Sequence, residues 1–191
     1  MSKRLLSAVL FLSALFLPAA SAWADEYSDT INVFKKAQQS RDFFNTADGY
    51  AVFPSIGKGG VGVGGAYGKG RVYEKGKYIG DTSMSQLSVG LQLGGQAYSQ
   101  IIFFQSPEAL KKFTAGNFEF SADASAVAIT AGASATAGTS GSSAGASATK
   151  NKAATTGAYN NGMAVFTVAK GGLMYEAAIA GQKFNYKPKG S

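Results

Sequence analysis

The chain has 191 residues, with 18 Lys and Arg against 11 Asp and Glu, and it contains no Cys and no His. The two missing residue types exclude disulfides, thiolate chemistry, Cys/His metal sites and histidine general bases. The formal net charge of +7 favours an anionic partner, such as phospholipid headgroups or nucleic acid.

The first 24 residues have the pattern of a cleaved secretory signal. Two basic residues precede an apolar core over Leu5–Leu17, and Ala22-Trp23-Ala24 has the A-x-A form of a cleavage site. The apolar core is shorter than the ~20 residues that a spanning helix needs. We therefore expect a signal peptide over residues 1–24, a single domain over 25–191, and export to the periplasm, with secretion as the alternative. An uncleaved membrane anchor is the competing interpretation.

The first elements of the expected domain are a helix and a short strand. Ser28 or Asp29 can cap a helix that runs to about Arg41. Tyr50–Phe53 then predicts a short strand that ends at Pro54.

The most distinctive segment is the glycine-rich stretch from Gly60 to Val72. Its even positions are almost all Gly or Ala, and its odd positions carry valine, tyrosine and two cations. Successive side chains of a strand point to opposite faces, so we expect one strand with a nearly bare face. Glycines in a strand let another element or a ligand approach the backbone closely. The predicted close-approach face consists of Gly60, Gly62, Gly64, Gly68 and Gly70.

Further strands are expected at short separations. Lys75-Gly76-Lys77 has the composition of a turn, and residues 86–97 alternate as a strand with one apolar face. That apolar face carries Leu87, Val89, Leu91 and Leu93. A buried strand over 98–105 precedes Ser106-Pro107, which is a strong start for a short helix.

The last third of the chain completes a β-rich domain. We expect an alternating strand over 117–131 and two more strands over 163–169 and 173–180. Residues 131–149 contain only Gly, Ala, Ser and Thr, which fits a hairpin of small residues or a flexible segment. The predicted fold class is α+β and β-rich: a curled or barrel-like antiparallel sheet with an N-terminal helix and a short mid-chain helix.

Four ordered blocks of the chain resemble the SYLF lipid-binding domain. They are Ala51–Ser55 with Lys58–Gly70, Ser88–Ala97, Phe118–Val127, and Ala169–Met174 with Ala178–Gly181. The resemblance implies a β-rich domain that binds membrane phospholipids, and some relatives also act in actin organisation. The chain departs from the family's Trp-Ser-x-Pro block at Tyr78–Ser83. An exported protein also does not meet cytosolic actin or phosphoinositides.

Two apparent cofactor or catalytic motifs lack the structural surroundings that their chemistry needs. Gly60-x-Gly62-x-x-Gly65 matches a dinucleotide fingerprint by spelling, but no helix follows it. Glu119 and Asp123, four apart on an expected strand, would lie ~13 Å apart, beyond the ~5–9.5 Å of a glycosidase pair. An outer-membrane barrel is disfavoured by the small-residue faces of several strands. We expect no enzyme activity, no cofactor and no metal site.

Five cations gather around the glycine-rich stretch, against the single acid Glu74. They are Lys58, Lys69, Arg71, Lys75 and Lys77. Each cation near an anionic leaflet contributes ~1 kcal/mol of attraction. We expect these residues to bind phospholipid headgroups at a membrane surface, and export makes nucleic acid a weaker partner. The alternative is an envelope structural domain that binds other proteins without a lipid, and the oligomeric state is left open.

Overall fold

The computed structural model describes residues 20–61, 63–89, 96–129, 157–170 and 179–191. The apolar core of the predicted signal and the segment over 131–149 lie outside these residues, as does most of the strand expected over 173–180.

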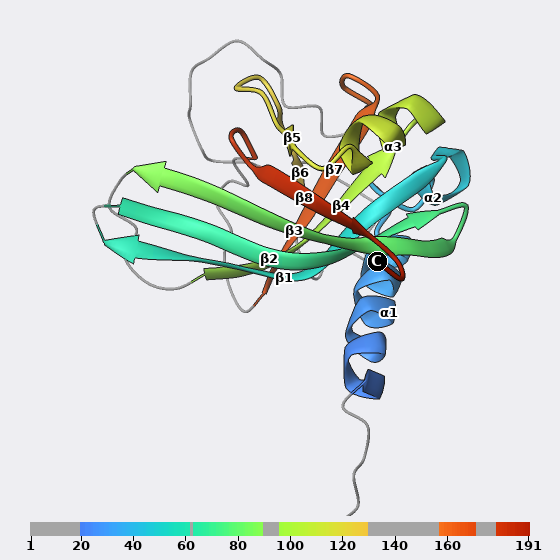
Figure 1. The fold of residues 1–191 in the computed structure, drawn as a ribbon, viewed down its shortest axis with the longest axis horizontal. Helices are drawn as coiled ribbons and strands as arrows, with labels where there is room; N and C mark the ends of the chain where they lie inside the picture. Colours follow the sequence, from blue (N-terminus) through green and yellow to red (C-terminus); the bar gives the residue numbers. More distant parts are fainter. Residues whose placement is uncertain (1–19, 62, 90–95, 130–156, 171–178) are drawn as a thin grey trace, which may run out of the picture.

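The described part of the chain contains three helices and eight strands (Figure 1). In chain order they are α1 (Ala20–Lys36), α2 (Phe43–Thr46), β1 (Gly49–Val61), β2 (Val63–Glu74), β3 (Lys77–Val89), β4 (Gln96–Phe104), α3 (Pro107–Thr114), β5 (Phe118–Glu119), β6 (Val127–Ile129), β7 (Met163–Lys170) and β8 (Lys183–Pro188). The strands form one sheet in the order β5-β8-β3-β2-β1-β4-β7-β6. Within the described residues, neighbouring strands pair antiparallel except β6 and β7, which are parallel.

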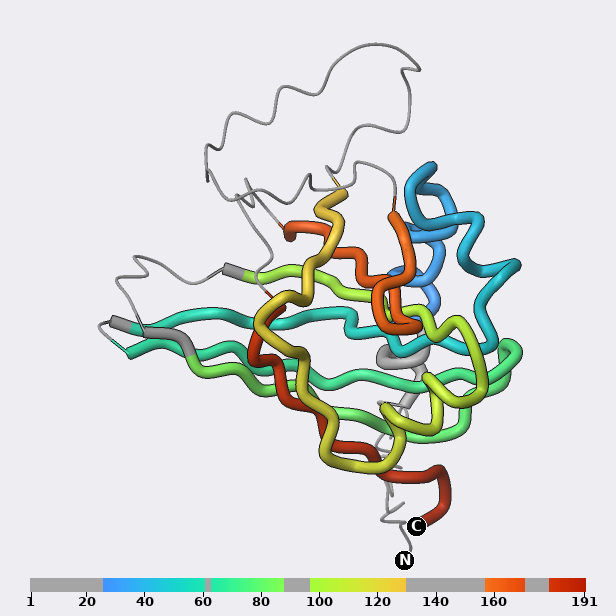
Figure 2. Tube along the Cα trace, turned by 90° about the horizontal axis from the view of Figure 1, so that it is seen from above, coloured from blue at the N-terminus to red at the C-terminus, as the bar shows by residue number. Residues whose placement is uncertain are grey.

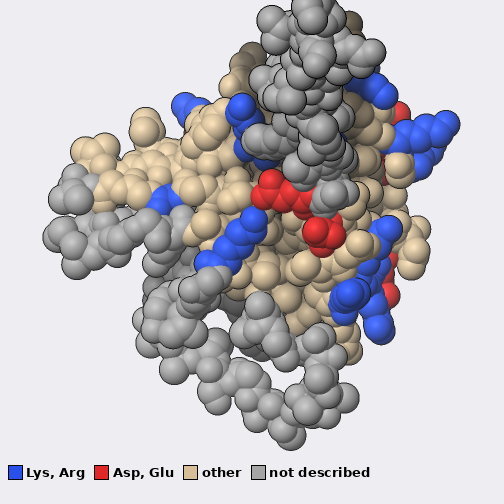
Figure 3. Space-filling model, turned by 90° about the horizontal axis from the view of Figure 1, so that it is seen from below, with Lys and Arg blue, Asp and Glu red and all other residues tan. Residues whose placement is uncertain are grey.

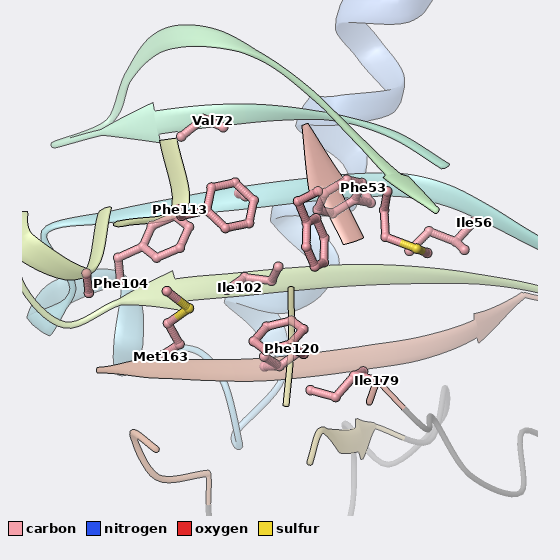
Figure 4. Close-up of a cluster of buried hydrophobic side chains, with 14 of the residues drawn as sticks. Phe53, Ile56, Val72, Ile102, Phe104, Phe113, Phe120, Met163 and Ile179 are labelled. Carbon is pink, nitrogen blue, oxygen red and sulfur yellow. The ribbon is translucent and has the colours of Figure 1, made fainter. Parts of the chain in front are cut away.

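The sheet curls and packs on both faces. On the α1 face, α1 and α2 cover a cluster that includes Phe34 and Phe103. On the opposite, α3 face, the core includes Phe53 and Phe113 (Figure 4). Although β3 and β2 lie between β8 and β1 in the sheet, the ring of Phe184 on β8 lies 5.7 Å from that of Phe53 on β1. This curvature confirms the predicted fold class.

Helix α1 begins upstream of both predicted caps. It starts at Ala20 rather than at Ser28 or Asp29, and it ends at Lys36 rather than near Arg41. Tyr27 and Phe34 are buried and seven residues apart, with Ile31 packed beside them, so one apolar stripe holds the helix on the sheet. Packing of this stripe, rather than a local capping signal, fixes where the helix lies.

Two predicted local signals are confirmed. The Ser106 side chain accepts a hydrogen bond from the Ala109 amide at 3.3 Å, and Pro107 begins α3. Lys75 and Gly76 have φ of +48° and +79° and join β2 to β3 in a tight turn.

Strand β1 continues past Pro54, where the sequence predicted its end. Its register shifts between Val52 and Ser55 against β2 and between Phe53 and Ile56 against β4. Proline cannot donate to a ladder, and such a bulge is where a sheet accommodates it. The Ser99 hydroxyl donates to the Pro54 carbonyl at 2.7 Å, which satisfies that acceptor.

The glycine-rich stretch is a hairpin rather than the single strand that we predicted. Strand β1 ends at Val61 and β2 begins at Val63, with Gly60 paired to Gly64. Gly60 has φ of +143°, and an added Cβ there would run into the Gly64 backbone. The predicted alternation holds from Val63 onward, because the even positions of β2 are buried up to Val72 and the odd positions are exposed or half-buried.

The strand predicted over 117–131 forms only as the short β5 and β6. Between them the Ser121 hydroxyl donates a hydrogen bond to the Asp123 carboxylate beside a turn. A local side-chain bond of this kind competes with a sheet ladder, and the intervening alanines have little apolar area to bury.

A buried polar cluster ties β4 to the segment that enters β8. Gln100 and Gln182 are fully buried and exchange two side-chain hydrogen bonds, at 2.9 Å and 3.1 Å. Gln182 also donates to the Tyr98 hydroxyl at 3.1 Å. The cluster satisfies the two amides on the otherwise apolar α3 face.

We expect Tyr98 to cause a loss of stability at alkaline pH. Burial raises the pKa of Tyr98 to about 12, against a smaller lowering by the Gln182 hydrogen bond. The folded pKa therefore exceeds the unfolded pKa of about 10, so this contribution is fully present below pH ~10 and is lost as the pH rises to ~12. The urea midpoint of Tyr98→Phe should fall less than that of the wild type over this range. Equal falls would contradict this role of Tyr98.

Candidate functional site

The fold places the cations predicted to bind headgroups on different faces of the sheet. Lys69 and Arg71 project from the α1 face of β2. Lys58 pairs with the buried Ala66 and follows the buried Ile56 by two residues, so it lies on the α3 face. Lys58 is therefore separated from the other two by the sheet.

Lys75 and Lys77 form a separate exposed pair at the β2–β3 turn. Lys75 Nζ lies 3.9 Å from the Asp48 carboxylate. Four residues along β2 separate Arg71 from Lys75, a spacing of ~13 Å. The structure thus brings together Lys69 and Arg71, two of the five predicted cations.

Strand pairing surrounds these two with further polar residues on the α1 face. The register forms three rows across β2, β3 and β8: Arg71, Asp81 and Lys187; Lys69, Ser83 and Asn185; Tyr67, Ser85 and Lys183. Directly opposite side chains of neighbouring strands lie ~4.5–5.5 Å apart. Four cations therefore share this surface with the one acid of the three rows, Asp81.

The first two rows, with Tyr67 of the third, line a shallow groove of about 520 Å³, which we call the cationic groove. Tyr27 of α1 closes one side, and the Arg71 guanidinium lies 4.3 Å from its ring centroid and 5.2 Å from that of Tyr78. The Arg71 side chain is 28% exposed, and its Nε lies 3.9 Å from the Asp81 carboxylate. Figure 3 shows basic side chains around a smaller group of acidic ones on the side of the molecule from which α1 projects. Arg71 is thus held in one orientation at the edge of the groove, while Lys69 and Lys187 are exposed.

Three of the predicted close-approach glycines, Gly64, Gly68 and Gly70, lie on the buried face of β2. An added Cβ would lie 2.6 Å from Phe53 Cδ1 at Gly70 and 2.6 Å from Ile56 Cγ1 at Gly68. Gly64 is buried on the same face. Gly60 lies in the hairpin, and Gly62 lies outside the described residues. At Gly68 and Gly70 the close neighbour is therefore another strand of this chain.

The sequence did not single out Tyr27, Ser83, Asn185 and Lys187 as groove residues. Lys187 and Asn185 enter through the pairing of β8 with β3, which joins segments far apart in the chain. A basic C-terminal tail was visible in the sequence, but nothing local to it indicates this pairing.

The described part of the chain holds no group of three His, Cys, Asp or Glu residues that could bind a metal ion. It also has no helix that combines the length and the apolar character needed to cross a membrane.

The curled sheet and the cationic groove define a β-rich domain with a basic groove on one face of the sheet. A model of the Ysc84 family, described as "Las17-binding protein actin regulator", matches residues 85–187. This match covers more than half of the chain, which therefore belongs to the Ysc84 family, the family of the SYLF domain predicted from the sequence. The matched region includes Asn185 and Lys187 but not Lys69 and Arg71. A comparison with curated proteins found no match.

Proposed function

We propose that this protein binds anionic phospholipid at a membrane surface without catalysis, and that the cationic groove is the headgroup site. The observation that carries the proposal is the cross-strand array of Lys69, Arg71 and Lys187 beside Asp81. Lys183, in the adjoining row, is paired with Glu119. We place this activity in the cell envelope after export, in the periplasm or, alternatively, outside the cell.

The groove offers the donors that a phosphate group accepts. Lys69 supplies an ammonium, and Ser83 and Asn185 in the same row supply a hydroxyl and an amide. Arg71 stacks on two tyrosines, so less side-chain entropy is lost when its guanidinium meets a phosphate. Each cation near an anionic leaflet contributes ~1 kcal/mol of binding free energy, so the array can bind a headgroup with moderate affinity.

A non-catalytic role agrees with the chemistry of the exposed acids. Asp81 lies near Arg71, and Glu119 Oε2 lies 3.6 Å from Lys183 Nζ, so each carboxylate has a cationic neighbour at the surface. The sequence offers neither a thiol nor an imidazole as nucleophile or base.

Protein binding through the same groove is the alternative, because the family description names a protein-binding actin regulator. Binding to a protein-free vesicle distinguishes the two functions. A lipid site responds to the headgroup charge of a protein-free vesicle, whereas a protein site does not require one.

Reversing two exposed cations of the groove should weaken membrane binding strongly. We expect Lys69→Glu/Lys187→Glu to weaken binding to phosphatidylglycerol/phosphatidylcholine vesicles at least about 30-fold at low salt, measured by co-sedimentation. The loss of ~1 kcal/mol of attraction at each site accounts for this factor, and the added repulsion increases it. The effect should shrink as salt screens the charges.

The matched control is Lys111→Glu/Lys112→Glu on α3, which changes the net charge equally but lies away from the groove. It should bind nearly as well as the wild type. Equal losses in the two variants would show that net charge alone matters. Undiminished binding of the groove variant would remove the groove as the site.

A further inference from the structure

The ends of β2 and β3, with the end of β1 beside them, form a tip at one end of the sheet. On the β3 side the tip extends beyond β8, which pairs with β3 only as far as Ser85. The tip consists of residues 59–61, 63–66 and 86–89. It extends from the body of the sheet on the side away from α3 (Figure 1, Figure 2).

The α1 face of this tip carries three exposed apolar side chains. Leu87 is 87% exposed, Val63 is 69% exposed and Tyr67, where the tip meets the groove, is 55% exposed. Leu87 pairs with Gly65, and Val63 and Tyr67 are the next residues of β2 on the same face. Because Gly65 has no side chain, it gives Leu87 nothing to pack against. We call Val63, Tyr67 and Leu87 the apolar lip.

At the lip, β3 turns a polar side chain toward the core face and an apolar side chain toward solvent. Gln86 turns to the α3 face and donates from its side-chain amide to the Ala180 carbonyl at 2.8 Å, while Leu87 turns outward. The apolar face that the sequence predicts around Leu87 therefore points to solvent at this residue rather than into the core. A sheet with one solvated face normally turns its apolar residues inward, because burying a leucine contributes ~1.5–3 kcal/mol. Leu87, Val63 and Tyr67 together leave apolar area on this face uncovered by the described residues.

We propose that the apolar lip inserts into the interfacial region of an anionic bilayer while the cationic groove holds headgroups. This inference rests on the proposed function and adds the apolar half of the membrane contact. The lip is continuous with the groove, because Tyr67 lines the groove and Lys69 is the next residue on the same face of β2.

The chemistry of the combined surface fits a bilayer boundary. Apolar side chains of peripheral proteins enter ~5–10 Å into the headgroup and acyl boundary, and cations remain at the phosphates. Tyr67, between Leu87 and Lys69, has the amphipathic side chain that is enriched at this depth. Figure 1 shows α1 standing on this face away from the tip, so the tip can approach a bilayer without displacing the helix.

A fluorescent label at the lip tests the insertion directly. The chain has no cysteine, so Leu87→Cys takes a single environment-sensitive nitrobenzoxadiazole label. We expect a blue shift and a severalfold rise in emission when phosphatidylglycerol/phosphatidylcholine vesicles are added. The same label at Ala115→Cys, exposed at the end of α3, should not change. If the labelled Leu87→Cys protein co-sediments with the vesicles but its emission does not change, the insertion is refuted and the proposed function stands.

Removing the apolar side chains separates the insertion from the charge attraction. Apolar contacts are not screened, so Val63→Ser/Leu87→Ser should lose at least about tenfold in vesicle binding at high salt, where the charge contribution is small. The control is Val33→Ser, at an exposed valine of α1, which should bind as the wild type does. Unaltered high-salt binding of the double serine variant would refute the insertion alone. A wild type that binds no vesicle would refute both proposals.

Discussion

Gly70→Val is expected to unfold at a much lower urea concentration than the wild type. An added Cβ at Gly70 would lie 2.6 Å and 2.7 Å from two ring carbons of Phe53 and 2.8 Å from the Val52 carbonyl oxygen. The ring is fully buried and the carbonyl belongs to a central strand, so neither can move away easily. Overpacking typically costs ~1–3 kcal/mol, and we expect a loss of about 3 kcal/mol because backbone is involved.

Gly57→Val is the matched control for this substitution. Gly57 lies on the neighbouring strand β1, and an added Cβ there meets nothing within 4 Å. Its free energy of unfolding should stay within ~0.5 kcal/mol of the wild type, as for other surface substitutions. Similar losses of unfolding free energy in Gly57→Val and Gly70→Val would show that replacing any glycine of these strands destabilises the sheet, with no special role for the contact with Phe53.

Gln182→Leu should also destabilise the protein strongly. The substitution leaves the buried Gln100 amide without its partner and removes a donor to the Tyr98 hydroxyl. An orphaned buried polar group costs ~1–3 kcal/mol, and two groups are affected here. We expect a loss of about 3 kcal/mol, measured by urea unfolding.

A double-mutant cycle tests whether the two glutamines act as a pair. Gln100→Leu/Gln182→Leu should cost less than the two single substitutions together, because neither amide is then left unpaired. Strict additivity would show that the two side chains do not depend on each other.

The local parts of the fold could be predicted because their signals lie within a few residues. The Ser106 cap, the turn at Lys75 and Gly76, and the alternation of β2 each follow from short-range sterics and hydrogen bonding. The bulge at Pro54 and the hairpin after Gly60 could not be predicted in this way. Both depend on the register with neighbouring strands. The alternation of small and large residues is the same in a tight hairpin as in one continuous strand, so it does not distinguish them.

The candidate site was predicted only in part for the same reason. Lys69 and Arg71 share one face by alternation along a single strand, whereas Lys58 was grouped with them by its nearness in sequence. Lys58 pairs with Ala66 and so lies on the other face. Lys187 joins the groove through pairing of β8 with β3, and Tyr27 joins it through docking of α1. Such contacts arise from tertiary packing, which the local pattern of a sequence does not encode.

The most direct measurement is co-sedimentation of the unmodified protein with phosphatidylglycerol/phosphatidylcholine vesicles and with phosphatidylcholine vesicles over a range of salt concentrations. We expect stronger binding to the anionic vesicles at low salt, since the cationic groove attracts the headgroups. This preference should narrow as salt rises, because exposed charges are screened beyond ~10 Å at 0.1 M ionic strength. Equal binding to the two vesicle types at low salt, or no binding to either, would contradict an anionic-lipid site in the groove.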